Sequence, residues 1–566
     1  MKVDTFFTNF DLLTDAPNAT AKLRELILQL AVMGKLVRQD PNDEPAAVLL
    51  ERIKLEKQQM IQNKVFFKSD KLIPINLNDI PYKIPSEWVL TRIGVICGSI
   101  VPNRDKPKSF SGEFPWITLS NFDDKGINLL NNHSGLGLSK EEIIKYNARI
   151  IPQGSVLMSC VGRFGLVAVI EQDVVTNQQI HGFVIPKGLC SEYIAYLIQS
   201  QKNFLESTAT STTISYLNKS RCESIPVPLP PLAEQKRIVE KCDRLMSLCD
   251  EIEKQHKQKQ DSIVRMNEGA IAQLLSSQNP DDFRHHWERI CNNFDLLYSV
   301  PETIPKLRQA ILQLAVMGKL VRQDPNDEPA QTLIKKIKAQ KKKLIEAKKI
   351  RKQEDLSSVK EEDKVYQLPE NWIWCRWNDI ALCIGDVDHK MPAETKEGIP
   401  YVSPKDFIKG NAIDFSKAKK ISQEDFETLK KKIQPSLGDI IFPRYGTIGE
   451  NRLVETDIDF LASYSCAVVK NFHSFIEPKY SFYYSLSNLV KKEIERYTNK
   501  TTQANVGVKS IKNFIFPLPP LAEQKRIVEK CDRLMSLCDR LEAKLKQGRE
   551  SREKLMEVAA KQVLLN

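Results

Sequence analysis

The stretch ILQLAVMGKLVRQDPNDEPA at residues 27–46 occurs a second time, without a change, at 311–330. A second stretch, PLPPLAEQKRIVEKCDRLMSLCD at 228–250, recurs unchanged at 517–539. Self-similarity of this kind is the sequence signature of a repeated architecture. The chain is therefore two tandem copies of one unit, and this duplication decides the fold.

Each copy of the second stretch predicts one long helix. Its two prolines suit a chain that enters a helix, and the apolar residues that follow are spaced in steps of four and three, which is a heptad pattern. A helix over about 232–275 would be roughly 65 Å long, so we expect it to act as a spacer. Antiparallel pairing of the two helices is the simplest way to bury both apolar stripes. The stripes consist of Ile238, Cys242, Leu245, Cys249 and Ile252 in the first copy, and of Ile527, Cys531, Leu534, Cys538, Leu541 and Leu545 in the second.

The first repeated stretch predicts a helix that is apolar on nearly every side, so we expect it to be buried on nearly every side. Two interpretations remain open: the helix is core, which the pattern slightly favours, or part of it docks a partner protein. The candidate docking residues are Leu30, Val32, Met33 and Leu36, with their counterparts Leu314, Val316, Met317 and Leu320. The lysine-rich run that follows at 335–352 is either a solvated helix face or a contact to DNA phosphates.

Between the repeated stretches lie two dissimilar ones, at about 85–225 and 369–515. They share only spaced residues: Pro85, Trp88, Gly154, Gly162 and Gly165 match Pro369, Trp372, Gly438, Gly446 and Gly449. Short apolar runs broken by Gly, Pro, Asn and Asp predict strands, whereas 191–200 and 480–497 predict helices. Each stretch is therefore expected to form a small α+β domain with a common backbone and different side chains.

In both domains a strand leads into a turn that contains glycine and an arginine, Arg163 in GRFG and Arg444 in FPRYGTIG. We expect the arginine to project outward, where an arginine fork can bond guanine O6 and N7. A plain surface arginine is the alternative.

Clusters rich in Thr, Asn, Gln and Lys end both domains at 210–221 and 498–510, and such residues contact phosphates and base edges. The stretches 103–109 and 177–182 are weaker candidates.

The composition is typical of a globular protein, because 42% of the 566 residues are hydrophobic and 27% are charged. The net charge of +11 is a modest bias toward polyanionic partners. No stretch approaches the roughly 20 apolar residues that span a bilayer, and we expect a cytoplasmic protein. The twelve cysteines are scattered without a CxxC spacing, which favours reduced core residues.

Motifs for catalysis are missing from the sequence. The Gly-Lys of MGKL is not a phosphate-binding loop, because Gln29 and Gln313 occupy the place of its leading glycine. No methyl-donor site and no metal or nucleophile cluster is evident. We therefore expect a protein that is not itself an enzyme. The alternatives are a single-chain fused DNA methyltransferase and recognition protein, and a coiled-coil adaptor that binds proteins.

The doubled PLPPLAEQKRIV and AVMGKLV segments, set around two dissimilar domains, resemble the specificity (S) subunit of type I restriction and modification systems. The resemblance covers essentially the whole chain. It implies target recognition domains at 81–227 and 366–516, separated by conserved helical segments at 1–80, 228–365 and 517–566. Each domain would recognise one half of a split, asymmetric DNA site.

The resemblance also implies partners. Two methyltransferase subunits would bind the helical segments, hold S-adenosylmethionine and methylate adenine, and two translocase and nuclease subunits that use ATP and Mg could join them. This chain would carry no cofactor of its own. One departure matters: the first domain has Cys160 where the second has Arg444.

The candidate DNA-binding residues follow from these clusters. They are Arg104, Lys106, Lys108, Arg163, Gln178, Gln179, Thr212, Tyr216, Asn218 and Lys219 in the first domain, and Lys405, Arg444, Tyr445, Thr447, Lys500, Thr501, Gln503, Asn505 and Lys509 in the second.

Overall fold

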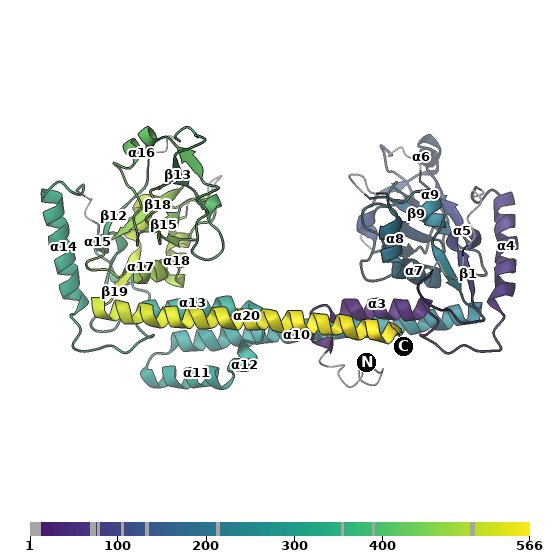
Figure 1. Ribbon diagram of the computed structural model, residues 1–566, viewed down its shortest axis with the longest axis horizontal. Helices are drawn as coiled ribbons and strands as arrows, with labels where there is room; N and C mark the ends of the chain where they lie inside the picture. Colours follow the sequence, from purple (N-terminus) through teal and green to yellow (C-terminus); the bar gives the residue numbers. More distant parts are fainter. Residues whose placement is uncertain are drawn as a thin grey trace. The chain divides into compact units, whose positions relative to one another are not determined.

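The structure is a computed structural model that describes residues 13–67, 75, 80–102, 107–130, 135–210, 215–352, 356–387, 391–498 and 504–565. It divides into two compact units. The first comprises Met1–Gln258 and Gly548–Asn566, and the second comprises Lys259–Gln547. Each unit combines helices from the repeated stretches with one α+β domain (Figure 1). The predicted fold class, two small α+β domains joined by long helices in a tandem repeat, is confirmed.

The first unit begins with helices and continues into its domain. Its elements are α3 (Ala19–Val32), α4 (Ala46–Gln62), β1 (Val89–Arg92), α5 (Ile93–Ile96), β2 (Gly98–Ile100), β3 (Phe114–Ile117), η2 (Leu119–Asn121), β4 (Gly137–Leu138), α6 (Lys140–Lys145), β5 (Ile150–Ile151), β6 (Val156–Ser159), β7 (Val167–Val169), β8 (Val174–Thr176), β9 (Ile180–Val184), α7 (Ser191–Ser200), α8 (Lys202–Thr208), α9 (Lys219–Glu223), β10 (Pro226–Leu229) and the first part of α10 (Leu232–Ser276).

The second unit repeats this order after a short helical insertion. Its elements are α11 (Pro280–Asn292), α12 (Phe294–Leu297), η3 (Pro301–Thr303), α13 (Ile304–Val316), α14 (Ala330–Glu346), η4 (Glu361–Asp363), β11 (Ile373–Arg376), α15 (Trp377–Ile380), β12 (Ala381–Gly385), β13 (Ile399–Val402), η5 (Pro404–Asp406), β14 (Lys419–Ile421), α16 (Gln423–Leu429), β15 (Ile440–Pro443), β16 (Arg452–Leu453), β17 (Leu461–Ala462), β18 (Cys466–Asn471), α17 (Pro478–Ser485), α18 (Asn488–Tyr497), α19 (Val508–Asn513), β19 (Ile515–Leu518) and most of α20 (Leu521–Leu565).

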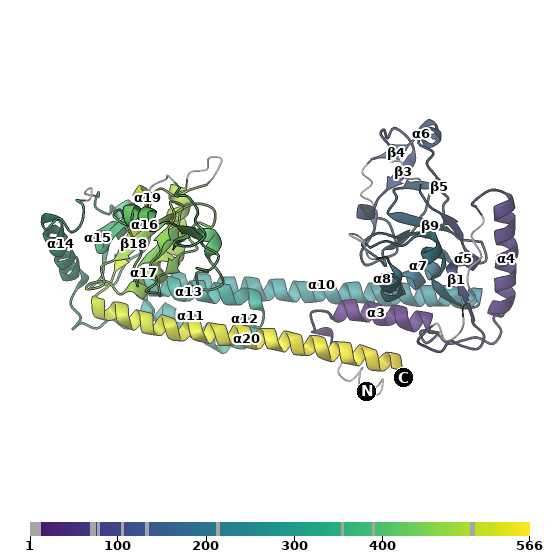
Figure 2. The same ribbon diagram turned by 45° about the horizontal axis from the view of Figure 1, so that its top comes forward.

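Both domains contain two sheets with matching strand orders, although the second sheet has four strands in the first domain and three in the second (Figure 2). In the first domain an antiparallel sheet has the order β2-β9-β6-β7, and a second sheet has the order β4-β3-β8-β5 with β3 and β8 parallel. In the second domain the corresponding orders are β12-β18-β15-β16 and β14-β13-β17, and β13 and β17 are parallel. The shared spacing of glycines and strands in the sequence thus corresponds to a shared backbone.

A two-stranded ribbon closes each domain at its base, β1 with β10 in the first and β11 with β19 in the second. Beside each ribbon a buried tryptophan ties the domain to its long helix. Trp88 Nε1 donates to Glu234 at 3.0 Å, and Trp372 Nε1 donates to Glu523 at 2.9 Å. The identical stretches of the sequence therefore make identical contacts in the two units, where they form a common support for unlike domains.

The two 45-residue helices α10 and α20 confirm the long helices that the heptad pattern predicts. Cys242 of α10 is buried in the main core of the first unit, together with Met556 near the end of α20. Cys531 of α20 is buried in the main core of the second unit, together with Leu274 near the end of α10. Each core thus holds the beginning of one long helix and the end of the other, which is the antiparallel order that the sequence predicts.

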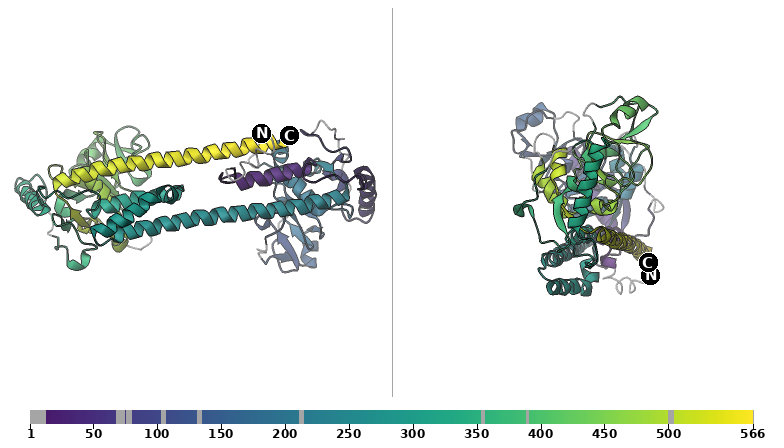
Figure 3. Two further views of the ribbon diagram at one scale, coloured as in Figure 1. Left: turned by 90° about the horizontal axis from the view of Figure 1, so that it is seen from below. Right: turned by 90° about the vertical axis from the view of Figure 1, so that its left-hand side faces the viewer.

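The apolar stripes of the long helices are covered mainly within their own units. Helix α3 lies along α10, where Arg24 forms an ion pair with Asp250 (Figure 3). In the second unit Arg308 of α13 forms the matching ion pair with Asp539 of α20 at 2.7 Å. The sequence predicts burial of the stripes, but it does not identify α3 and α13 as the helices that cover them. Among the described residues, no helix is long and apolar enough to cross a membrane.

Candidate nucleic-acid interface

Three segments that are distant in the sequence meet beside the glycine turn of the first domain. The turn follows β6, and Cys160 N donates to Gln179 O at 2.8 Å, from the loop between β8 and β9. Leu217 N donates to Cys160 O at 2.8 Å, and Gly162 N donates to Ser215 O at 3.0 Å. We call this meeting of residues 160–165, 177–179 and 215–218 the first junction.

The second domain holds the same junction at residues 444–449, 463–465 and 504–506. Arg444 N donates to Ser465 O at 2.8 Å, and Val506 N donates to Arg444 O at 3.0 Å. Tyr445 pairs with Asn505 as Val161 pairs with Tyr216 in the first domain. These backbone bonds align Cys160 with Arg444, so the register inferred from the three glycines is correct.

Glycine is required in both turns because the backbone there is left-handed. Gly162 has φ of 73° and Gly446 has φ of 70°, a region that residues with a Cβ rarely adopt. The positions that follow these glycines, Arg163 and Thr447, are exposed. The two junctions thus share a tight backbone that presents different side chains to solvent.

The first junction presents a basic and amide-rich surface. The Arg163 side chain is 58% exposed and its guanidinium lies 2.5 Å from the Asp124 carboxylate, which is 64% exposed. Gln178 and Gln179 are exposed, and Tyr216 is 44% exposed. An exposed ion pair of this kind contributes little to stability, so the Arg163 fork is available to an outside acceptor.

The expectation that both arginines project outward is wrong for Arg444. Its residue is only 6% exposed, because the side chain turns back into the domain. Its Nε donates to Val506 O at 3.0 Å, and its Nη1 forms an ion pair with Asp386, just after β12. The glycine turn fixes the backbone, whereas the half-buried carboxylate of Asp386 determines the direction of the Arg444 side chain.

The first domain replaces this ion pair with uncharged residues. Ser99 pairs with Phe183 in the first domain, and Ile384 forms the equivalent pair with Val469 in the second. Val101, two residues after Ser99, therefore takes the position of Asp386, two residues after Ile384. Cys160 stands at the position of Arg444, and burial raises the pKa of its thiol to about 11, so that it stays protonated. The charge inside the junction therefore differs between the domains although the backbone does not.

The second junction carries half-buried aromatic and amide groups and one exposed hydroxyl group. Tyr445 is half-buried, and its ring lies 6.4 Å from that of Tyr464 in a T-shaped arrangement. Asn505 is half-buried beside it and Thr447 is exposed. The sequence does not point to Asp124, Asp386 or Tyr464, since their part in the junctions depends on contacts between distant segments.

The other predicted DNA-binding residues lie outside the junctions or at their borders. Asn218 caps α9, accepting from Arg221 N at 2.9 Å, and Lys219 lies 3.7 Å from the buried Glu223. Lys108, Lys405 and Lys509 are exposed. Six candidates fall outside the described residues: Arg104, Lys106, Thr212, Lys500, Thr501 and Gln503.

The predicted partner-docking residues are in part core. The docking interpretation is wrong for the buried ones, Val32, Leu314, Val316 and Met317. For the half-buried ones, Leu30, Met33, Leu36 and Leu320, it stays a prediction. Val32 belongs to the main core of the first unit, with Leu30 and Leu36 partly buried against it, and Met33 is half-buried. Leu314, Val316 and Met317 are buried in the second unit and Leu320 is partly buried. The buried apolar residues of this helix are covered by the chain itself.

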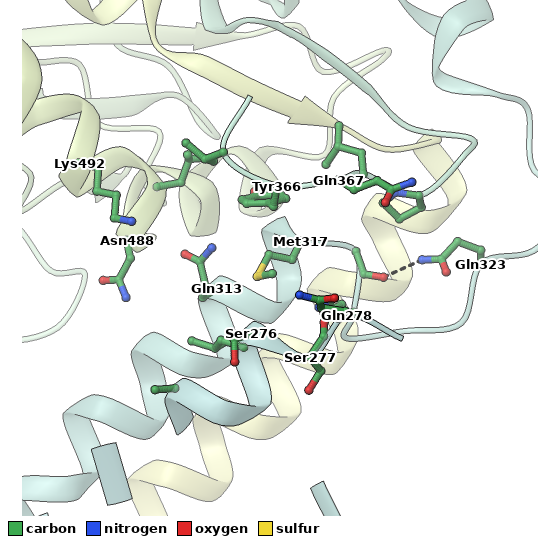
Figure 4. Close-up of a pocket in the computed structure, with 18 residues that line it drawn as sticks. Ser276, Ser277, Gln278, Gln313, Met317, Gln323, Tyr366, Gln367, Asn488 and Lys492 are labelled. Atoms are coloured by element: carbon green, nitrogen blue, oxygen red, sulfur yellow. Dashed lines mark hydrogen bonds between the residues drawn. The ribbon is translucent and has the colours of Figure 1, made fainter. Parts of the chain in front are cut away.

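A hollow of about 930 Å³ lies in the second unit, away from the junction (Figure 4). It is lined by residues that include Gln313 and Met317 of α13 and its C-cap, Tyr366, and Lys492 of α18. The Oε1 atom of Gln313 is buried there without a hydrogen-bond partner. Gln323 donates to Gly318 O at 2.8 Å along its wall. The hollow contains none of the residues of the second junction.

Comparisons with known proteins identify similar chains. Residues 85–260 and 369–548 each match the family model for the type I restriction modification DNA specificity domain. The specificity subunit of the type I restriction enzyme EcoAI from Escherichia coli is 30% identical over 547 residues, which cover 94% of this chain and 91% of that protein. The EcoEI specificity subunit from Escherichia coli is 30% identical over 570 residues, with the same coverage. A solved HsdS subunit from Thermoanaerobacter tengcongensis is 18% identical, with a TM-score of 0.39 and coverage of 84% of this chain and 98% of that one.

Proposed function

Because the chain belongs to the family of type I restriction-modification DNA specificity subunits, we propose that each of its two domains recognises one half of a split DNA site. The first junction would contact one half-site and the second junction the other. Since the exposed side chains of the two junctions differ, the two half-sites would have different sequences. The site as a whole is then asymmetric.

The observation that supports this proposal is the pair of junctions, which have one backbone and two sets of side chains. Cys160 and Arg444 make the same two backbone hydrogen bonds, yet one side chain is a neutral thiol and the other a guanidinium paired with Asp386. A structural adaptor has no need to vary the side chains on a conserved backbone. A subunit that distinguishes base sequences needs this variation, because base edges are read by side chains.

The exposed groups of the first junction suit base edges in the major groove. The Arg163 fork matches the O6 and N7 acceptors of guanine, and the amides of Gln178 and Gln179 match adenine N6 and N7. Asp124 accepts from one nitrogen of the Arg163 fork, Nη2, at 2.5 Å. We infer that DNA replaces Asp124 as the acceptor when the first half-site binds.

The long helices would set the number of unread base pairs between the half-sites, and would dock two methyltransferase subunits in the cytoplasm. Those subunits would supply S-adenosylmethionine and the adenine methylation chemistry. Two restriction subunits that use ATP and Mg could join the assembly. In this proposal the present chain contributes sequence recognition and no catalytic group.

The proposal is tested by mapping methylated adenines across host DNA, with and without the gene for this chain. The expected result is a single split motif that loses methylation when the gene is removed, and rescue by the intact gene. Methylation that is unchanged without the gene, or a motif with one uninterrupted block, would overturn it. Binding of labelled methyl donor by the purified chain alone would instead favour a fused methyltransferase.

A further inference from the structure

Helix α14 in the second unit carries a lysine-rich face that its counterpart α4 lacks. Both helices have 17 residues, begin after a proline and are related by 284 positions. Helix α14 contains six basic residues and one acidic residue, whereas α4 contains three basic and two acidic ones. The difference in net charge, +5 against +1, lies on an otherwise equivalent helix.

The two helices are held to their units in the same way, so the charge difference does not arise from packing. Leu333 and Ile337 of α14 are buried, and Lys341 turns inward to donate to Asn378 O and Ala381 O at 2.7 and 2.8 Å. In the first unit Lys57 takes the place of Lys341 and donates to Gly94 O. The extra lysines of α14 are therefore on the surface.

The exposed lysines of α14 form two rows. At 100° per residue, Lys335, Lys338 and Lys342 lie along one flank of the exposed side of the helix, and Lys336 and Lys343 lie along the other flank. Among these five, only Lys336 has an ion-pair partner among the described residues, Glu328 at 2.6 Å. Unpaired positive charges at this density repel one another, so they favour a polyanion.

The surface of α4 contains its own counter-charges. Lys54 pairs with Glu51 at 2.7 Å, and α14 has Lys335 in place of this glutamate. The Arg52–Glu44 pair, at 2.9 Å, corresponds to the Lys336–Glu328 pair and so occurs in both units. Where α14 has Lys342 and Lys343, α4 has the neutral Gln58 and Gln59. The unpaired positive face is thus a property of one unit, and not of the repeated helix as such.

We propose that the lysine face of α14 binds the phosphate backbone of DNA next to the second half-site. The inference rests on the proposed function, because it assigns a further contact of the same DNA. Lys335 and Lys342 are about 10 Å apart along the helix, which is close to the roughly 12 Å width of the major groove. Lysine is a compact charge suited to phosphate oxygens, and it carries no base information there.

The test uses the full chain in complex with its methyltransferase subunits, and measures affinity against salt concentration. One variant, Lys335→Glu/Lys342→Gln/Lys343→Gln, gives α14 the residues that α4 already has at the same positions. The reciprocal variant, Glu51→Lys/Gln58→Lys/Gln59→Lys, gives α4 a lysine face. The probes are a duplex with the mapped site and a scrambled duplex of equal length.

For the α14 variant, the slope of log affinity against log salt should fall in magnitude by about 3, since each phosphate contact contributes about 1. Affinity should fall by the same factor on both duplexes, and ethylation of phosphates beside the second half-site should no longer interfere. The reciprocal variant should increase the slope. An unchanged slope for the α14 variant would overturn the inference. A variant that binds DNA normally but no longer assembles with its partner subunits would also overturn it, because the lysine face would then bind an acidic protein.

The two levels of the proposal can fail separately. If the unmodified complex binds the mapped and scrambled duplexes equally, the proposed function fails. If it prefers the mapped duplex and the α14 variant keeps the original salt dependence, only the assignment of the lysine face fails.

Discussion

Arg444 forms a partly buried ion pair with Asp386 in the second domain, and Cys160 and Val101 occupy the same two positions in the first. The side chains at both positions differ between the two domains, whereas the backbone around them is the same. The junction therefore tolerates a charged or an uncharged interior, provided that the two positions match.

Replacement of Arg444 by alanine should destabilise the second domain by about 1 to 3 kcal/mol, because Asp386 and the Val506 carbonyl lose their donor. Chemical denaturation measures this loss. The matched control is the double variant Asp386→Val/Arg444→Cys, which installs the pair of the first domain and should recover at least half of it. Selective loss of one half-site without any loss of stability would instead make Arg444 a direct DNA contact.

Arg163→Ala should weaken DNA binding and leave the stability of the first domain nearly unchanged. The side chain is 58% exposed, so the free energy of unfolding should change by less than about 0.5 kcal/mol. Affinity for the first half-site should fall by about 1 to 3 kcal/mol if Arg163 bonds a guanine. Binding measurements on duplexes altered in one half-site distinguish this from a phosphate contact, which would weaken binding to all sequences equally.

Asp124→Ala is the companion to this change. Since Asp124 competes with DNA for the Arg163 guanidinium, its removal should increase affinity for the first half-site. A decrease would show that Asp124 positions Arg163 for binding.

The glycine that follows the repeated helix should be equally important in both units. Gly34 has φ of 69° and an added Cβ would lie 2.4 Å from Pro85 Cγ; Gly318 has φ of 70° and the same distance to Pro369 Cγ. Gly34→Ala and Gly318→Ala should each destabilise their unit by more than 1 kcal/mol, about the cost of an incompatible backbone. Unequal losses in thermal or chemical unfolding would contradict the equivalence of the two supports.

Stability should depend on pH through Lys341. Burial lowers the pKa of this lysine to about 8 from an ordinary value of 10.5. Between these values the folded protein binds fewer protons at Lys341 than the unfolded chain, so its contribution becomes more favourable as pH rises from 8 to 10. The stability of the natural chain relative to Lys341→Met should increase over this range. A constant difference would mean that Lys341 keeps an ordinary pKa.

The sequence predicts the parts of the fold that depend on periodicity. The steps of four and three at Ile238 and Cys242 indicate a buried helical stripe, and these residues are buried. The same pattern does not say what covers a stripe, because any apolar surface of the right shape satisfies it. For this reason α3, and not α20 alone, covers α10, and the apolar side chain of Leu314 is core and not a docking surface.

The junctions could be predicted only in part. The spaced glycines identify the turn and align Cys160 with Arg444, because a left-handed backbone position strongly selects glycine. The direction of the Arg444 side chain depends on Asp386, which lies 58 residues earlier in the sequence. No local pattern contains this information, so the outward orientation was predicted wrongly for one arginine of the two.

The most direct test of the account exchanges residues 81–227 for the corresponding domain of another family member, and maps methylated adenines in cells that carry the exchanged chain. We expect a new first half-site, with the second half-site and the number of intervening base pairs unchanged. A change in both half-sites, or in the intervening length, would contradict the claim that two independent domains recognise DNA from a common support.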